Sequence, residues 1–286
     1  MKIAFLITAF SNYDHLRRLV MALDDDQVQF YIHIDKKSEM PDNLGNPNVN
    51  FIKRRKVWWG GWSHTAAILD LMKESQKCKP DYHVLLSGAD YPIRPNAFLY
   101  KMLESGGEYI NIIKGFHHHK PESRIKYYHF DNFDRRDPGS RKSIIFKKLE
   151  EILRKVYKKK SYPFKHIYHG STWWALSSDA VNYILAELKT KPELKRFFKS
   201  SWCPEESLIP TIIGNSNIRN QCRNNITFTD WSTNPAPARI TREHVEMFRQ
   251  GNEFENVYGT YRPFFARKFD DDSKDLIDVI EEKLRT

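Results

Sequence analysis

The sequence lacks several features that would assign it to common protein classes. Its three cysteines, Cys78, Cys203 and Cys222, are too few and too scattered in 286 residues for a disulfide framework or a zinc motif, which indicates reduced thiols in a cytosolic protein. No apolar run reaches the roughly 20 residues of a membrane-spanning helix, and the mean hydropathy is −0.65. The 12 glycines form neither a GxGxxG fingerprint nor a P-loop, so a dinucleotide or P-loop nucleotide site is not expected.

Positive charge is present in excess, and it is concentrated in one segment. The chain has 46 Lys and Arg against 36 Asp and Glu, a net charge of +10. Ten of these basic residues and two of the acidic ones lie between Arg141 and Lys165, so this segment carries +8. Such a charge favours an anionic partner. Because no nucleic-acid-binding motif occurs, we do not expect nucleic acid, although a basic binding module without catalysis is the alternative to an enzyme.

The hydrophobic pattern predicts an α/β protein with a mixed, mostly parallel central sheet flanked by helices. In the first part of the chain, strands are predicted within 1–10 and at 29–34, 49–52, 83–87 and 109–113, with helices at 12–23, 62–73 and 96–103. After a polar stretch at 115–142, helices are predicted at 144–157, 179–188, 192–198, 206–212 and 242–249 and from 272, with strands at 226–229 and 263–267. We find no linker and expect a single domain, 1–286.

Ligands of parallel sheets bind at the carboxyl ends of the strands, so Ala9, Phe10, Asp35 and residues 87–90 are candidates. The acidic clusters at 24–26, 131–137 and 270–272 follow no strand of this sheet, so we predict no metal site. We expect the first and the last of these clusters to have capping roles at helix ends. The histidines at 117–119 are expected to be solvated, because adjacent loop residues seldom converge on one ion.

Two short motifs combine residue types that are used in catalysis. Pro204 suits the first turn of a helix, and Glu205 and Glu206 are either an ordinary acidic first turn or include a general base that the helix N-terminus orients. Arg267 and Lys268 follow an apolar strand. They either bind phosphate in place of a metal ion or form surface ion pairs with the acidic residues that follow.

Six short blocks occur in order along the chain: IHIDKK at 32–37, WGGWS at 59–63, LSGADYPIR at 86–94, GSTWW at 170–174, PEE at 204–206 and FARKFD at 265–270. Together they resemble the signature of the glycosyltransferase 14 or "Branch" family. This family comprises the core-2/I-branching N-acetylglucosaminyltransferases and the peptide O-xylosyltransferases. Each block is short, but the ordered set is specific.

The resemblance implies a GT-A-like (Rossmann-like) fold and an inverting glycosyltransferase that uses a UDP-sugar without a divalent metal or other cofactor. It implies that Glu206 is the catalytic base and that Arg267 and Lys268 bind the UDP diphosphate. The other donor-binding positions that it implies are Thr8, Ala9, Asp35, Trp59, Asp90 and Arg239, with Arg242 as a further candidate. The sugar and acceptor pocket is expected to include Ser171, Thr172, Trp173, Glu122 and Arg124, with Tyr127 and Tyr128 nearby.

On the basis of this resemblance, we expect 1–113 to be the nucleotide-binding half and 114–286 the acceptor and catalytic half. Thr172 stands where xylosyltransferase-like members carry Asp, and Cys203 stands where the family usually has Ser. The donor that we expect is therefore UDP-GlcNAc, with UDP-xylose as the alternative and a glycan hydroxyl as the acceptor. Animal members carry a membrane anchor, a stem and many cysteines. A chain without them is expected to be a bacterial cytoplasmic enzyme of surface polysaccharide synthesis.

The basic helix expected at 144–157 lies outside every block of the resemblance. Its apolar stripe comprises Ile145, Phe146, Leu149, Ile152, Leu153 and Val156. Two interpretations stay open. The helix is either a solvated element whose apolar stripe packs on the domain, or it makes peripheral contact with an anionic membrane or with an acidic or lipid-linked acceptor through 141–165.

Overall fold

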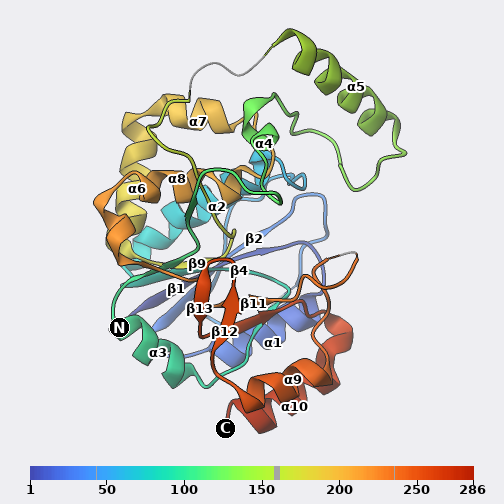
Figure 1. Ribbon diagram of the computed structural model, residues 1–286. Coiled ribbons are helices and arrows are strands. Elements are labelled where there is room, and N and C mark those ends of the chain that lie inside the picture. Colours follow the sequence, from blue (N-terminus) through green and yellow to red (C-terminus); the bar gives the residue numbers. More distant parts are fainter. Residues whose placement is uncertain (43, 158–161, 235) are drawn as a thin grey trace.

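The computed structural model describes residues 1–42, 44–157, 162–234 and 236–286. Within these residues, the central sheet has seven strands in the order β10-β6-β9-β4-β1-β2-β3 (Figure 1). They are β1 (Ile3–Ala9), β2 (Val28–Ile34), β3 (Val49–Phe51), β4 (Tyr82–Ser87), β6 (Glu108–Ile110), β9 (Trp174–Ser177) and β10 (Cys222–Arg223). Neighbouring strands are parallel except at β9, which runs antiparallel to β4 and β6. The predicted α/β class, with a mixed, mostly parallel central sheet, is confirmed.

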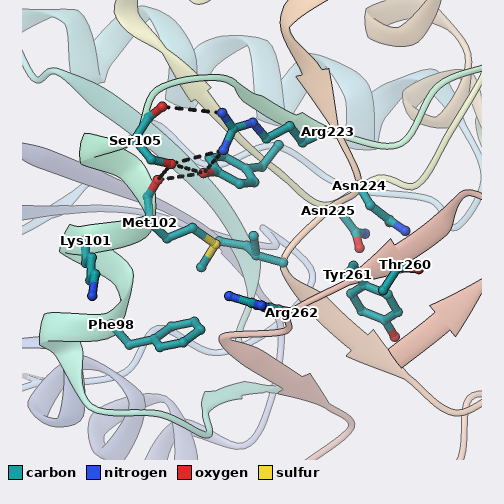
Figure 2. Close-up of a pocket in the computed structure, with 12 residues that line it drawn as sticks. Phe98, Lys101, Met102, Ser105, Arg223, Asn224, Asn225, Thr260, Tyr261 and Arg262 are labelled. Atoms are coloured by element: carbon teal, nitrogen blue, oxygen red, sulfur yellow. Dashed lines mark hydrogen bonds between the residues drawn. The ribbon is translucent and has the colours of Figure 1, made fainter. Parts of the chain in front are cut away.

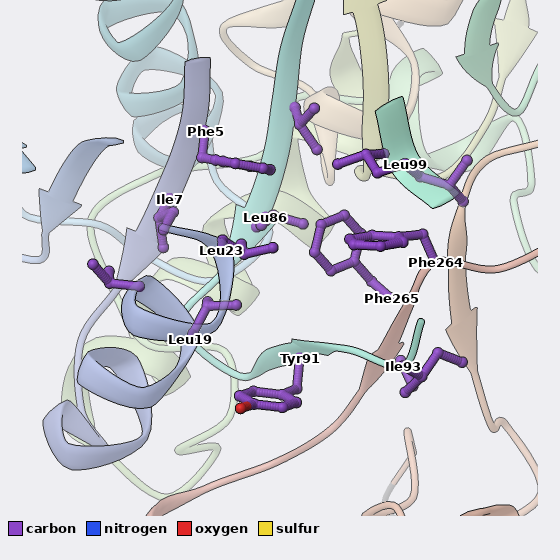
Figure 3. Packing of buried hydrophobic residues seen from close by; sticks show 14 of the residues in the cluster. Phe5, Ile7, Leu19, Leu23, Leu86, Tyr91, Ile93, Leu99, Phe264 and Phe265 are labelled. Carbon is purple, nitrogen blue, oxygen red and sulfur yellow. The ribbon is translucent and has the colours of Figure 1, made fainter. Parts of the chain in front are cut away.

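Helices cover both faces of the sheet because its central strands are apolar on both sides. In β1, Phe5 and Ile7 enter one core while Ala4 and Leu6 enter the other, and all four are buried. The core around Phe5 and Ile7 (Figure 3) includes side chains of α1 (Tyr13–Leu23), α3 (Asn96–Glu104), α9 (Arg242–Gln250) and α10 (Lys274–Leu284). The opposite core includes side chains of α2 (Trp62–Ser75), α6 (Ser178–Thr190), α7 (Pro192–Phe198) and α8 (Leu208–Gly214).

A smaller sheet brings the C-terminal part of the chain to the loop that follows β4. It consists of β11 (Thr227–Thr229), β14 (Phe265–Arg267) and β5 (Asp90–Pro92). The antiparallel pairing of β14 with β5 sets Arg267 opposite Asp90. Two further strand pairs are present: β7 (Ile113–Lys114) with β8 (Tyr168–His169), and the hairpin of β12 (Phe254–Asn256) and β13 (Gly259–Tyr261). The pairing of β14 with β5 thereby brings the block at 265–270 beside the block at 86–94, although they are far apart in the sequence.

Most predicted elements are present, and the differences occur where tertiary contacts decide the structure. No strand was predicted at β9, a four-residue segment that is buried between β4 and β6. The helix predicted at 206–212 is two elements, a 3₁₀ turn over Pro204–Glu206 and α8 from Leu208. The single-domain assignment, with halves at 1–113 and 114–286, stays a prediction, although strands from both halves complete the central sheet.

The basic helix predicted at 144–157 is α5 (Arg141–Val156), which stands away from the body of the protein (Figure 1). Only part of its apolar stripe packs inward, because Ile145, Leu149, Ile152 and Val156 are 40–66% exposed. The interpretation in which the whole stripe packs on the domain is therefore wrong. Three residues that add to the charge of this segment, Lys158, Lys159 and Lys160, lie outside the described residues. No helix in the described part of the chain is both long and apolar enough to cross a membrane.

Candidate functional site

The carboxyl ends of β1, β2 and β4 form the floor of the candidate site. The amide of Asp35, directly after β2, donates a 2.9 Å hydrogen bond to the carbonyl of Ala9, and the amide of Gly88, after β4, donates one of 2.9 Å to Thr8. A side chain on Gly88 would bring its Cβ to 2.8 Å from Cβ of Ala9, so the loop can lie this close only with glycine there. The structure thus brings together three of the predicted donor-binding positions, Thr8, Ala9 and Asp35.

The carboxylate of Asp35 is fixed by backbone amides. Oδ1 of Asp35 accepts hydrogen bonds from the amides of Lys37 (2.9 Å) and Val57 (3.2 Å), and Lys37 Nζ lies 3.5 Å from Oδ2. Lys37 also lies 4.2 Å from the ring centre of Trp58. A hollow of about 470 Å³ adjoins the ends of β1 and β2 and is lined by Phe10, Ser11, Asn12, Tyr13, Asp14, Ser38, Glu39 and Asp271. Its position at the strand ends suits a flat polar ligand.

Arg267 forms an ion pair with a buried carboxylate and stacks on an aromatic ring. Its Nε lies 3.3 Å from Oδ1 of Asp90, and its guanidinium lies 4.3 Å from the ring centre of Trp173. Asp90 is fully buried and also accepts hydrogen bonds from the amide (2.7 Å) and hydroxyl (2.9 Å) of Ser87. Burial raises the pKa of Asp90, while the charge of Arg267 opposes that rise; burial lowers the pKa of Arg267. Asp90 and Trp173 therefore hold Arg267 in place.

Further cations surround Lys268. Loss of hydration around the exposed Lys268 ammonium lowers its pKa, and so do the charges of Arg267, Arg136 and Arg239, while Asp270 opposes them. Arg239 forms a 2.6 Å ion pair with Asp270 and is 69% exposed. Mutual repulsion of this kind is relieved when an anion binds, so the cluster suits a diphosphate. The sequence did not single out Arg136, which comes from the polar loop before α5.

The carboxylate of Glu206 forms the second part of the site. Its Oε2 accepts hydrogen bonds from Nζ of Lys120 at 2.8 Å and from Nη1 of Arg124 at 2.6 Å. All three side chains are about one-fifth exposed (23%, 17% and 19%), so the group borders solvent. No described residue donates a hydrogen bond to Oε1, which leaves this oxygen accessible to a ligand. Arg124 was predicted for the acceptor pocket, whereas Lys120 was missed.

The adjacent carboxylate, Glu205, points into the body of the protein. It is buried, with Oε1 3.4 Å from Nδ1 of His64 and Oε2 accepting a 3.4 Å hydrogen bond from the hydroxyl of Thr65. Both partners lie in the first turn of α2, so Glu205 ties the 3₁₀ turn to that helix. The left-handed backbone of Cys203 (φ 49°) precedes the turn. Of the two acids in the motif, Glu205 is therefore buried in the fold and Glu206 borders solvent.

The block at 170–174 joins the two parts of the site. The Gly170 amide donates a 2.9 Å hydrogen bond to the carbonyl of Glu206, and Lys120 Nζ donates to the carbonyl of Gly170. A Cβ on Gly170 would lie 1.7 Å from the carbonyl oxygen of Asn111, so only glycine fits. Three residues later, Trp173 stacks on Arg267. The hydroxyl of Ser171 accepts a 3.2 Å hydrogen bond from the Trp173 amide, and Thr172 beside it is half-buried.

A buried histidine lies beside this block. Nδ1 of His169 is 2.9 Å from the hydroxyl of Ser207, and its Nε2 has no hydrogen-bond partner among the described residues. Burial, followed by the charges of Lys120 and Arg124, lowers the pKa of His169 to about 3. The ring is therefore neutral at physiological pH, and it adds no further positive charge next to Glu206.

The glycine turn at 59–61 packs on the segment that leads to Glu206. Trp59 is 48% exposed, and its ring lies edge-on to that of Trp202, with centres 6.2 Å apart. Gly60 has a φ of +69°, and a Cβ there would lie 2.4 Å from Nε1 of Trp202. The Trp202 ring in turn lies 5.4 Å from the guanidinium of Arg124. The turn thus supports Arg124, which holds Glu206.

Some predicted residues have other partners. Glu122 accepts hydrogen bonds from Lys126 (2.8 Å) and from the hydroxyl of Tyr162 (2.6 Å), and no described contact joins it to Glu206. Arg242 begins α9 and has no described contact with the cation cluster. Tyr127 stacks near Arg154 of α5 at 5.3 Å, and Tyr128 is 40% exposed. These positions stay predictions.

The acidic clusters at 24–26 and 270–272 lie at helix ends, as predicted, and the histidines at 117–119 are exposed. Asp270 caps the 3₁₀ turn over Asp271–Ser273, and Oδ1 of Asp271 accepts a 2.7 Å hydrogen bond from the amide of His15 near the start of α1. Asp24 is the C-cap residue of α1. Across residues 1–42, 44–157, 162–234 and 236–286, no three His, Cys, Asp or Glu side chains are grouped so that they could hold a metal ion.

A second hollow lies away from these residues. It has a volume of about 450 Å³ and lies between α3 and the segments around β10 and β13 (Figure 2). It is lined by Phe98, Lys101, Met102, Ser105, Tyr109, Arg223, Asn224, Asn225, Ile226, Thr260, Tyr261 and Arg262. No predicted site residue is among them, so its size alone does not make it the candidate active site.

Comparison with known proteins adds a family match. The model of the Core-2/I-branching enzyme family matches residues 3–252. Xylosyltransferase 1 of Canis lupus familiaris is 25% identical over 293 residues, covering 94% of this chain and 29% of the relative. Xylosyltransferase 2 of Homo sapiens is 24% identical over 288 residues, covering 93% and 31%. The chain therefore spans about a third of the length of these relatives. Among solved structures, HddC from Yersinia pseudotuberculosis aligns with 63% of this chain and 79% of its own at a TM-score of 0.30 and 13% identity, too low to support an inference.

Proposed function

The chain belongs to the Core-2/I-branching enzyme family, and from this premise we propose that it is a glycosyltransferase that moves a sugar from a UDP-sugar to a glycan hydroxyl with inversion. One observation carries the proposal. The segment from Gly170 to Trp173 contacts Glu206 at one end and Arg267 at the other. Lys120 joins the Glu206 carboxylate to the carbonyl of Gly170, and Trp173, three residues further along, stacks on Arg267, so this one segment links the carboxylate to the cations proposed to bind the diphosphate.

In this proposal, Arg267 and Lys268 bind the diphosphate of the donor. When the bond between the sugar and the diphosphate breaks, negative charge grows on the leaving oxygen. Fixed cations stabilise that charge more in the transition state than in the ground state. Arg267, Arg136 and Arg239 repel the Lys268 ammonium and lower its pKa. This supports the role, because a bound diphosphate would relieve the repulsion. Asp90, buried beneath, acts as a positioning residue for Arg267.

Glu206 is the proposed general base. It would take the proton from the acceptor hydroxyl as that oxygen attacks the anomeric carbon from the face opposite the diphosphate, which inverts the configuration to β. Positioned general-base catalysis contributes about 10²–10⁴-fold in rate. Lys120 and Arg124 both bind Oε2, which fixes the carboxylate and leaves Oε1 to accept the proton. Asp35, at the end of β2, is proposed to accept the uracil N3–H.

The donor sugar has two candidates. The Thr172 position supports UDP-GlcNAc, as the sequence led us to expect, and the names of the matched relatives support UDP-xylose. We propose that neither needs a divalent ion, and the support for this is the group of cations around Lys268. The role in bacterial surface polysaccharide synthesis and the cytoplasmic location stay predictions from the sequence.

A thermal-shift panel tests the proposal. Ligand binding to the folded state raises apparent stability by mass action, so UDP, UDP-GlcNAc or UDP-xylose should raise the Tm in the presence of EDTA, whereas GDP-mannose should not. Stabilisation by UDP only after manganese is added would contradict the metal-free part. No response to any uridine nucleotide, with or without manganese, would contradict the proposal as a whole. Transfer assays with the two UDP-sugars then identify the donor.

A further inference from the structure

The outward face of α5 carries an apolar stripe that nothing in the described chain covers. Ile145, Leu149, Ile152 and Val156 follow one another at spacings of four, three and four residues, which places them within about 60° on one side of the helix. Their exposed fractions are 56%, 40%, 50% and 66%. Isolated exposed apolar residues are common in proteins, but an aligned set of four on one helix marks an interaction surface.

The packing of α5 holds this stripe outward. A different side of the helix, about 90–130° round from the centre of the stripe, carries Phe146, which stacks on Phe133 with ring centres 5.5 Å apart. It also carries Glu150, which accepts hydrogen bonds from the Phe130 amide (2.8 Å) and from Arg135 (3.1 Å) and is 3% exposed. Turning the stripe inward would break this buried ion pair, so the exposure of the stripe is built into the docking of α5.

Basic side chains border the stripe. Arg141, Lys148 and Lys155 recur every seven residues along one side of it, and Lys142 lies on the other side. All four are exposed, and within the described residues none of them forms an ion pair. The one exposed acid of the helix, Glu151, lies more than about 100° round the helix from the centre of the stripe. The face is therefore apolar in the middle and cationic at its edges.

We propose that this face of α5 docks on the surface of an anionic lipid bilayer. A helix with an apolar stripe and flanking lysines lies in the membrane interface, with the stripe in the acyl boundary and the cations at the acidic headgroups. A nucleic acid would engage the cations but leave the stripe in water. A second copy of this chain would bring like charges together. The bilayer is the partner that matches both components, and the inference does not depend on sugar transfer.

Vesicle co-sedimentation of the full chain tests the proposal. The wild-type protein should bind phosphatidylcholine vesicles that contain about one third phosphatidylglycerol at least about tenfold more tightly than pure phosphatidylcholine vesicles. One variant, Leu149→Ser with Ile152→Ser, removes apolar contact. A second, Lys148→Glu with Lys155→Glu, reverses the edge charge. Each should lose at least about tenfold of the affinity for anionic vesicles.

Matched controls separate the surface from general effects. Lys189→Glu with Lys195→Glu reverses two exposed charges on α6 and α7, and Met21→Ser with Val257→Ser removes two exposed apolar side chains elsewhere. Both controls should bind vesicles like the wild type. Circular dichroism and the Tm of each variant show that α5 and the body are folded.

Four results would overturn the proposal. The first is equal affinity for neutral and anionic vesicles, and the second is vesicle binding that is unchanged in both α5 variants. The third is salt-sensitive binding of RNA or DNA that only the charge variant loses. The fourth is a concentration-dependent dimer that forms without lipid and that the apolar variant abolishes. The third would identify the face as a nucleic-acid surface, and the fourth as an interface between copies.

Discussion

Lys120 and Glu206 are 86 residues apart in the sequence, yet Nζ of Lys120 donates a 2.8 Å hydrogen bond to Oε2 of Glu206. Arg124 donates to the same oxygen at 2.6 Å. The same Lys120 ammonium also donates to the carbonyl of Gly170, in the segment that reaches Arg267. Lys120 therefore fixes the carboxylate relative to the cation cluster, and its removal should disturb orientation more than donor binding.

Lys120→Met should lower kcat of sugar transfer by about 10–100-fold, because a shift of about 1 Å in a catalytic group costs about that much. The affinity for UDP should change by less than about threefold, and Lys120→Arg should restore part of the rate. The control is Lys126→Met, which removes a lysine that pairs with Glu122 one turn away and should keep the wild-type rate. Equal kcat values for Lys120→Met and Lys126→Met would contradict the role of Lys120.

Lys268→Met should weaken UDP binding about tenfold, since a charge-assisted contact to phosphate is lost, while the Tm without ligand stays within a few degrees because Lys268 is exposed. Isothermal titration with UDP and with uridine measures this. The loss should appear for UDP and vanish for uridine, which has no phosphate. Lys274→Met, a nearby exposed lysine, is the control. Equal losses for UDP and uridine would show that Lys268 does not act on the diphosphate.

Gly60→Ala and Gly106→Ala form a matched pair for the glycine turn. Both glycines have a left-handed backbone, with φ of +69° and +72°, so both substitutions carry the same backbone cost. At Gly106 the added methyl meets open space, whereas at Gly60 it lies 2.4 Å from Trp202 Nε1. The free energy of unfolding should fall by about 1–3 kcal/mol more for Gly60→Ala, with loss of transfer activity. Equal destabilisation in urea unfolding would contradict the packing of this turn on Trp202.

The Glu150 ion pair predicts a dependence of stability on pH. Burial alone would raise the pKa of Glu150, but the neighbouring His129 ring, Arg135 guanidinium and Phe130 amide outweigh it and lower the pKa from 4.5 to about 2. A depressed pKa adds stability that is fully present above the ordinary value and is lost as the pH falls toward 2. This contribution is at most about 3 kcal/mol.

Urea unfolding of the wild type and of Glu150→Gln should therefore give different free energies at pH 7, and the difference should shrink between pH 4.5 and 3. Glu151→Gln, which removes the adjacent exposed carboxylate, should show no such trend. A wild-type advantage that is constant with pH would mean that the charge of Glu150 does not hold α5 in place.

Much of the fold and part of the site followed from the sequence, for local reasons. The strands β1, β2 and β4 are continuous apolar runs, and this pattern can be recognised in the sequence without knowledge of tertiary contacts. Residues directly after those strands, such as Asp35, were predicted as site residues because ligands of parallel sheets bind at the carboxyl ends of the strands. Strand β9 was missed because its four residues show no period, and only the gap between β4 and β6 makes them a strand.

The rest of the site depends on contacts between distant segments. Lys120 follows three histidines in a polar loop, and Arg136 lies among alternating charges, so neither carries a pattern that marks it. Glu205 and Glu206 are identical in type and adjacent, and only the packing of Glu205 on α2 separates their roles. The apolar stripe of α5 could be read from its spacing, but whether it faced the core depended on Phe146 and Glu150.

The most direct test of the account compares Glu206→Gln with Glu205→Gln in a transfer assay with UDP-sugar and acceptor. Glu206→Gln keeps the shape of the side chain and removes the base, so it should bind UDP as the wild type does and lose about 10²–10⁴-fold in kcat. Glu205→Gln changes a carboxylate that ties the turn to α2, and it should keep most of the rate at some loss of stability. Wild-type turnover by Glu206→Gln would contradict the assignment of Glu206 as the base.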